Sequence, residues 1–168
     1  MTKPKTDPDD TGGLIKVSPL YPNDDILRVF GEIAFLSFYS DLYGEWSARS
    51  IAKSFEPPVY LKQFTVYRAK NVPRGIVTWA MLDKKTEKKH IAGKGLDEFD
   101  EWRSGNQLWI MDIMAPWGHG GEIIENIKST IQEDSVKTLR IHKDQKKILE
   151  WHRAPNTTKW KIRSQAID

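Results

Sequence analysis

An apolar stretch that holds a single carboxylate lies past the middle of the chain and limits its fold most strongly. Between residues 108 and 115 every side chain except Asp112 is apolar, and Pro116 follows directly. A run of this kind, ended by proline, predicts a strand that is covered on both faces. Counting every second residue places four side chains on one face: Leu108, Ile110, Asp112 and Met114.

Asp112 is the unusual residue of this predicted strand. A carboxylate on a covered face is costly unless it is paired or lines a cavity. Ionisable groups in such places are often functional, because burial changes their pKa. We therefore predict a functional role for Asp112. The alternative is a structural aspartate that bonds to backbone amides of a neighbouring loop.

The segment after Pro116 combines a glycine-rich turn with the start of a helix. Residues 117–121 read Trp-Gly-His-Gly-Gly, and an apolar helical pattern follows over residues 122–131. Free backbone N–H groups and the positive end of the helix dipole would then point at one spot. The turn is a candidate phosphate site, although a short glycine-rich loop can also be only a tight turn. The residues that would form the site are Gly118, His119, Gly120 and Gly121.

Composition limits the chain to a few classes of protein. Its 168 residues suffice for one domain with a full core, and 39% are hydrophobic. The absence of cysteine excludes disulfides, a thiolate nucleophile and cysteine-ligated metal. The four histidines lack metal-ligand spacing, so we expect no metal site. Residues 1–20 are polar and predict a flexible arm rather than a secretory signal, with the domain at residues 21–168. No run reaches the length of a membrane span, which favours the cytoplasm.

Positive charge is concentrated near the C-terminus. The net charge is only +3, but residues 137–163 hold nine basic residues against Asp144 and Glu150. This imbalance favours an acidic partner. An acidic carrier protein, a nucleic acid and a merely solvated basic face all fit it. We expect no nucleic acid, because this part of the chain lacks a recognisable recognition motif.

Periodicity along the chain predicts an α+β protein with a mixed central sheet of roughly five to seven strands flanked by helices. We expect helices at residues 22–40, 47–55 (ended by Pro57 and Pro58) and 121–132. A short amphipathic piece is expected at 96–102, and a solvated loop or short helix with exposed lysine pairs at 83–94. We expect strands at 63–69, 76–82, 108–115, 136–142, 147–151 and 158–162.

The order of these elements resembles the GNAT acyltransferase fold. The local sequence is more specific: residues 100–106 (DEWRSGN) and 109–118 (WIMDIMAPWG) closely resemble the RTX toxin-activating lysine acyltransferase family. The resemblance covers residues 26–155, and further matches are Gly31, Ser40, Trp46, residues 78–80 and residues 139–141.

The resemblance implies an enzyme that takes a fatty acyl chain from acyl carrier protein. It transfers the chain to the ε-amine of internal lysines of an RTX-type protoxin in the cytoplasm. The co-substrate is then the acyl-phosphopantetheine of the carrier, with no tightly bound cofactor. Its phosphate would lie on the glycine turn, Arg140 would hold it or the carrier, and Ser40 would donate a hydrogen bond near the reacting centre. Members of the family are described as homodimers that associate peripherally with the membrane.

In the family, catalysis is ascribed to the strand aspartate and to a histidine after the first helix. Counting from Gly31 through Ser40 to Trp46 places Tyr43 at the histidine position. Three interpretations follow. Tyr43 acts as acid or hydrogen-bond donor with Asp112 as base, or His119 or His152 folds into the gap, or the chain is a carrier-binding paralogue without turnover. A small-molecule or peptide amine is an alternative acceptor.

Overall fold

The computed structural model describes residues 22–142, 145–154, 157 and 159–167, so the predicted arm at residues 1–20 lies outside the described residues. The α-helices are α1 (Asp24–Phe38), α2 (Ala48–Tyr60), α3 (Lys84–Ile91) and α4 (Gly120–Thr130), and the short 3-10 helices are η1 (Tyr43–Glu45) and η2 (Phe99–Arg103). The strands are β1 (Phe64–Ala69), β2 (Val72–Leu82), β3 (Gln107–Met114), β4 (Ser135–His142), β5 (Gln145–Arg153) and β6 (Trp160–Ile167).

The six strands form one mixed sheet in the order β1-β2-β3-β4-β5-β6, which confirms the predicted α+β class. Neighbouring strands are antiparallel except for β3 and β4, which are parallel. A parallel pair needs a crossover connection, and α4 supplies it here. The expected helix over residues 121–132 is therefore the element that joins the two parallel strands.

Strands β3 and β4 remain paired over a short distance only. Their register runs from Leu108 opposite Val136 to Ile110 opposite Thr138. Beyond this point β3 continues to Met114 and β4 to His142 without pairing to each other. The ends of the two central strands therefore diverge, and the divergent end of β3 leads directly into the glycine turn.

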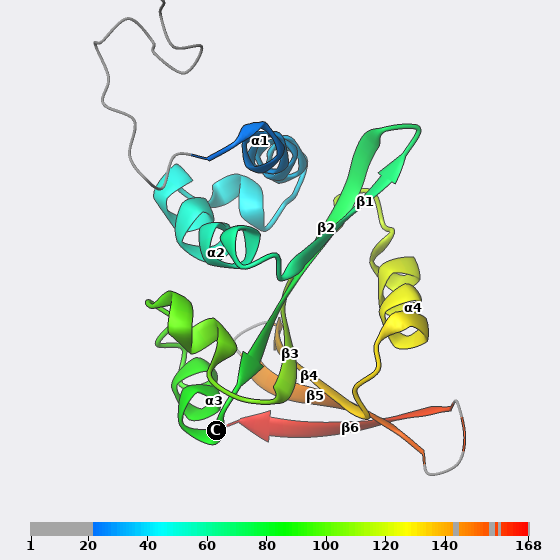
Figure 1. Cartoon of the computed structure of the whole chain (residues 1–168). Helices are drawn as coiled ribbons and strands as arrows, with labels where there is room; N and C mark the ends of the chain where they lie inside the picture. The colour runs from blue at the N-terminus through cyan, green and yellow to red at the C-terminus, as the bar shows by residue number, and fades with distance from the viewer. Residues whose placement is uncertain (1–21, 143–144, 155–156, 158, 168) are drawn as a thin grey trace, which may run out of the picture.

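The helices cover the sheet on both faces (Figure 1), with α1, α2 and α3 on one side and α4 on the other. Three apolar clusters follow from this arrangement. One joins α1 and α2 to the sheet around Ile33 and Phe55, and a second lies under α4 around Ile123. The third joins α3 and η2 to Trp109, which is fully buried.

A β-bulge in β3 makes the expected alternation of its side chains wrong. Thr78 of β2 lies opposite Asp112, but the next residue, Trp79, lies opposite Ile110, so Met111 is an extra residue. Such an insertion reverses the side-chain order beyond it. Leu108 and Ile110 consequently pack under α4, whereas Met114 packs against α1 and α2. The hydroxyl of Tyr43 in η1 reaches Asp112 from the same side.

Helix α2 continues past the prolines that were expected to end it. Pro57 and Pro58 lie inside the helix and are buried. A proline removes one backbone donor, but its carbonyl still accepts. Here Pro57 O accepts from Leu61 N at 3.0 Å and Pro58 O from Gln63 N at 2.8 Å. The helix ends instead at Tyr60, and Lys62 follows two residues later with a left-handed φ of 57°.

The charged segment after β2 is a helix, α3, rather than a loop. Asp83 caps it by accepting from Thr86 N at 2.7 Å. Lys84, Lys85 and Lys88 are exposed as expected. Lys89 is not, because its ammonium group donates to Glu101 at 2.7 Å and to Asp97 at 3.0 Å. This pairing ties α3 to the segment that leads into β3.

The sequence block before β3 that supports the family resemblance has a structural role. Trp102 of η2 is 3% exposed and packs beside Trp109. Ser104 Oγ accepts from Asp83 N at 3.1 Å. A Cβ atom on Gly105 would overlap the backbone of Leu82 and Asp83, so only glycine fits there.

Replacing Gly105 by alanine should destabilise the fold by about 1–3 kcal/mol, because backbone atoms cannot move aside as a flexible side chain can. The matched control is Gly31→Ala in α1, where nothing lies within 4 Å of an added Cβ. Alanine favours the helix at that position by about 1 kcal/mol. Chemical denaturation should therefore show a lower free energy of unfolding for Gly105→Ala and a higher one for Gly31→Ala. Equal changes in the two variants would contradict the close packing of Gly105 on the backbone of Leu82 and Asp83.

Candidate active site

Tyr43 is held in place by the turn that connects α1 to α2. Ser40 Oγ accepts from Tyr43 N at 3.3 Å, and Ser40 O accepts from Gly44 N at 2.8 Å. The ring of Tyr43 packs against Trp46 and Phe55, with centroid distances of 4.9 and 5.8 Å. Only 6% of Tyr43 is exposed. Ser40 was predicted to donate near the reacting centre, and in the structure it positions Tyr43.

The hydroxyl of Tyr43 donates to Asp112 Oδ1 at 2.7 Å, although 69 residues separate the two in sequence. Asp112 is partly buried and reaches this partner from the β3 bulge. The structure thus brings together the two residues that were predicted as catalytic. No other hydrogen bond to the carboxylate of Asp112 occurs within the described residues.

Both groups have altered acidity. Burial raises the pKa of Asp112 to about 6, and the hydrogen bond from Tyr43 opposes this rise. Burial also raises the pKa of Tyr43 well above its usual value, and the charge of Asp112 raises it further. Around neutral pH the pair is therefore a carboxylate that can accept a proton and a phenol that keeps its own.

Thr78 lies directly opposite Asp112 in the β2–β3 ladder and was not predicted as a site residue. It is fully buried, and its hydroxyl makes no hydrogen bond within the described residues. A buried hydroxyl without a partner is costly. The sequence offered a signal for it, because a threonine within the apolar strand IVTWAML was an exception like Asp112.

The glycine turn lies at the divergent end of β3. Gly118 has φ of 86°, which requires glycine, and its N–H bonds to Ala115 O at 3.2 Å. A Cβ atom on Gly118, Gly120 or Gly121 would meet nothing within 4 Å. The start of α4 therefore faces open space, as a phosphate cradle requires. Phosphate binding itself stays a prediction.

His119 and Arg140 flank this region without contacting Asp112. His119 precedes α4, lies 3.7 Å from Glu122, and lines a cavity of about 690 Å³ together with Arg74. Arg140 is exposed on the part of β4 that has diverged from β3. Lys147 of β5 lies opposite it in the ladder. The roles predicted for both residues toward a phosphate or carrier remain predictions.

Neither histidine proposed as a substitute fills the place of Tyr43. His119 belongs to the glycine turn, and His152 lies on β5 opposite Ser135 and Lys161. Within the described residues neither one hydrogen-bonds to Asp112, which accepts from the tyrosine instead. In the described residues it is thus Tyr43, and not a distant histidine, that contacts the carboxylate of Asp112.

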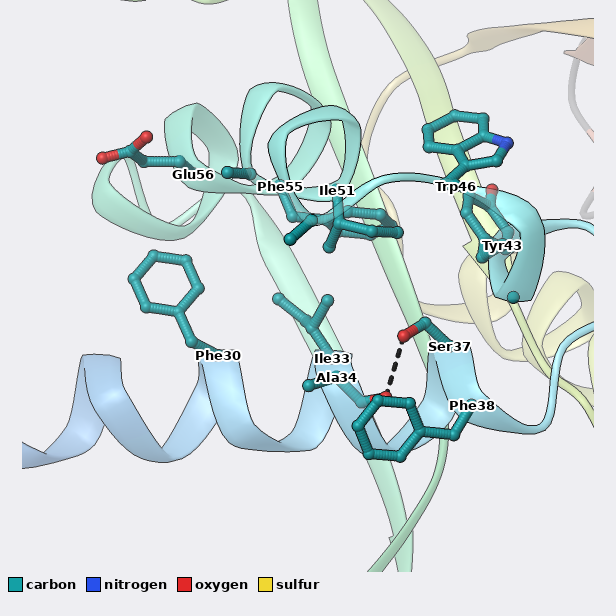
Figure 2. A pocket seen from close by; sticks show the side chains of 13 residues that line it. Phe30, Ile33, Ala34, Ser37, Phe38, Tyr43, Trp46, Ile51, Phe55 and Glu56 are labelled. Carbon is teal, nitrogen blue, oxygen red and sulfur yellow. Dashed lines mark hydrogen bonds between the residues drawn. The ribbon is translucent and has the colours of Figure 1, made fainter.

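A cavity of about 670 Å³ lies between α1 and α2, with Tyr43 in its wall (Figure 2). The sequence analysis did not predict it. The sequence did contain one indication of it. The apolar residues of α1 extend around more of the helix surface than is needed to pack against a single neighbouring element. Phe38 shows this most clearly, because it is 75% exposed.

Comparison with known proteins identifies the family. A model of the RTX toxin acyltransferase family matches residues 23–154. The chain belongs to this family. An uncharacterized protein of Synechocystis is 32% identical over 130 residues, which cover 76% of this chain and 88% of the relative. A leukotoxin-activating lysine-acyltransferase of Mannheimia haemolytica serotype A1 is 28% identical over 126 residues, or 75% of each chain. The sequence-based resemblance is thus confirmed.

No helix within the described residues is long and apolar enough to cross a membrane.

Replacing Asp112 by asparagine should stabilise the protein at pH 8 by about 2 kcal/mol and change little at pH 4. Asparagine keeps an acceptor for Tyr43 but carries no charge. Because the pKa of Asp112 is raised to about 6, the stability that its neutral form contributes is present at low pH. That contribution is lost as pH rises through 6, because Asp112 then ionises. The asparagine variant keeps it, because its side chain stays neutral at every pH.

Urea unfolding at both pH values measures this difference. The exposed Asp41→Asn is the matched control and should change stability by less than about 0.5 kcal/mol at either pH. A stabilisation by Asp112→Asn that is equal at pH 4 and pH 8 would show that burial does not raise the pKa of Asp112.

Proposed function

We propose that this protein transfers a fatty acyl chain from acyl carrier protein to the ε-amine of lysines in an RTX-type protoxin. The observation that carries the proposal is the hydrogen bond of Tyr43 to Asp112 in a chain of the RTX toxin acyltransferase family. Relatives named as leukotoxin-activating lysine-acyltransferases support the choice of reaction and acceptor. The cytoplasm and a homodimer belong to the same proposal.

The acyl-phosphopantetheine arm enters where β3 and β4 diverge, as in a GNAT-like fold. The short pairing of these strands leaves their ends separated, and the start of α4 borders the same end of β3. Gly118, Gly120 and Gly121 present backbone N–H groups and open space to its phosphate. The thioester then reaches Asp112 at the bulge, a few residues before the turn.

The reaction needs a base and a proton donor, and the pair supplies both. The neutral lysine nitrogen attacks the thioester carbonyl, a C–N bond forms, and Asp112 accepts the proton that the nitrogen loses. The C–S bond then breaks. Tyr43 gives its proton to the leaving sulfur while protonated Asp112 returns one to Tyr43 through their 2.7 Å hydrogen bond, so that no phenolate forms. The products are an amide and a free thiol, and both residues return to their starting states.

The altered acidity of the pair fits these roles. A pKa of about 6 leaves Asp112 ionised at neutral pH, yet makes it a stronger base than an exposed aspartate. The raised pKa of Tyr43 makes it a hydrogen-bond donor rather than a base. A tyrosine thus serves as donor at the position where the family resemblance implies a histidine.

Acyl transfer from fatty-acyl carrier protein, followed by intact mass of an RTX-type acceptor and a lysine peptide, tests the proposal. Asp112→Ala should lower the rate by at least a hundredfold, because it removes the base. The rate of the natural chain should rise with pH through about 6, as Asp112 ionises. Tyr43→Phe should move this rise to higher pH, because the hydrogen bond from Tyr43 lowers the pKa of Asp112.

Other outcomes point elsewhere. Activity only after Tyr43→His would mean a scaffold without its own proton-transfer group, and would favour a carrier-binding role. Transfer to the lysine peptide but not to the RTX-type acceptor would favour a small-molecule or peptide amine. Full activity in Asp112→Ala would remove Asp112 from the mechanism.

Carrier docking is assigned to the exposed basic face of the C-terminal strands. Arg140 and Lys147 lie opposite each other on β4 and β5, and both are exposed. They adjoin the place where β3 and β4 diverge, so a carrier bound there could direct its arm toward Asp112. Positive charge of this kind speeds association with an acidic partner, and this effect becomes weaker as the salt concentration rises.

Reversing both charges (Arg140→Glu with Lys147→Glu) should weaken carrier binding at least tenfold at low salt, with a smaller effect at high salt. The matched control reverses Lys84 and Lys85, which are exposed on α3. Calorimetric titration with acyl carrier protein measures the affinity of each double variant. Equal weakening by both double variants would place the carrier elsewhere.

A further inference from the structure

We infer that the cavity between α1 and α2 holds the hydrocarbon chain of the acyl donor and sets the chain length that the protein accepts. This inference rests on the proposed function and makes it more specific. The cavity measures about 670 Å³ and is lined by residues of α1, η1 and α2. Its volume falls within the range of sites that enclose small organic ligands.

The lining of the cavity is suited to a hydrocarbon. Phe30, Phe38 and Ile51 line it with apolar side chains that keep accessible surface. Ile33 and Phe55 also belong to the lining and are almost inaccessible to water. Ser37 also lines it, but its hydroxyl donates to Ala34 O at 2.8 Å within α1. The hydroxyl of Tyr43 is bonded to Asp112. Neither hydroxyl needs a partner from a ligand, so an apolar ligand would leave neither of them unsatisfied. The charged residue of the lining, Glu56, is exposed to solvent.

The cavity adjoins the candidate active site at Tyr43. Tyr43 lines it with its ring and bonds to Asp112 with its hydroxyl. A thioester beside this hydroxyl would therefore have its carbonyl at the polar side of Tyr43 and its chain along the apolar side. The same residue separates the reacting group from the chain.

The two ends of the cavity differ. Figure 2 shows Tyr43 and Trp46 at one end and Phe30 and Glu56 at the other. Along α1 the lining extends from Phe30 to Phe38, which is about 12 Å at the rise of an α-helix. Phe30 packs edge-on to Tyr60 with a centroid distance of 6.1 Å. The ring of Phe30 thus limits the far end of the cavity, and Ala34 lies between the two ends.

Two substitutions with opposite expected effects test this inference. Ala34→Phe fills the middle of the cavity, and Phe30→Ala lengthens it. The measurement is kcat/KM for octanoyl, dodecanoyl and hexadecanoyl carrier protein. Each methylene that no longer fits should cost about fourfold. Ala34→Phe should lower the hexadecanoyl-to-octanoyl ratio at least tenfold, because at least two further methylenes of the longer chain no longer fit, and Phe30→Ala should raise it.

The matched control is Ala92→Phe at the exposed end of α3, which lines no part of the cavity and should leave the ratio unchanged. Thermal unfolding verifies that each variant is folded. An unchanged ratio in folded, active Ala34→Phe and Phe30→Ala proteins would overturn the inference.

A binding measurement separates the failure of this inference from the failure of the proposed function. Fluorescence titration with the fatty acid cis-parinaric acid needs no carrier and no acceptor. Binding that is at least tenfold weaker in Ala34→Phe than in Ala92→Phe supports the cavity as the chain site, even if no protein transfers an acyl group. Equal binding by these two variants overturns it, whether or not transfer occurs.

Discussion

The extra residue at Met111 in β3 is the constraint on which the site depends. Without it, Asp112 would follow the alternation of Leu108 and Ile110 and lie under α4, among apolar side chains. The bulge moves the carboxylate to the face that carries α1 and α2. There the hydroxyl of Tyr43 can reach it at 2.7 Å. One inserted residue thus replaces a costly buried charge with a hydrogen-bonded one.

The pairing of Tyr43 with Asp112 joins three parts of the molecule. The turn after α1 supplies the tyrosine, β3 supplies the aspartate, and the cavity between α1 and α2 lies on the far side of the tyrosine ring. Burial raises the pKa of both groups, so that near neutral pH Asp112 is a carboxylate that can accept a proton and Tyr43 is a phenol that donates a hydrogen bond. The glycine turn follows the end of β3 that diverges from β4, so it lies at the same end of the strand as Asp112.

Much of the fold was predictable because its local signals agreed. The apolar run at β3, the capped start of α1 and the helix after the glycine turn all formed as expected. Errors arose where tertiary packing outweighed local preference. Pro57 and Pro58 stay inside α2 because the core buries them and their carbonyls are satisfied by later residues. Lys89 is held by two carboxylates that only the folded chain brings near.

The sequence by itself determined the family and the α+β class, and it singled out Asp112 and Tyr43 as candidate site residues. These depend on residue identity and spacing, which local patterns record. Only the tertiary structure decided that the two residues meet, that neither His119 nor His152 replaces the tyrosine, and that a cavity lies between α1 and α2. The reason is physical: a bulge changes the face of every later side chain in its strand, and a cavity depends on how two helices pack. Neither can be located from the period of the apolar residues alone.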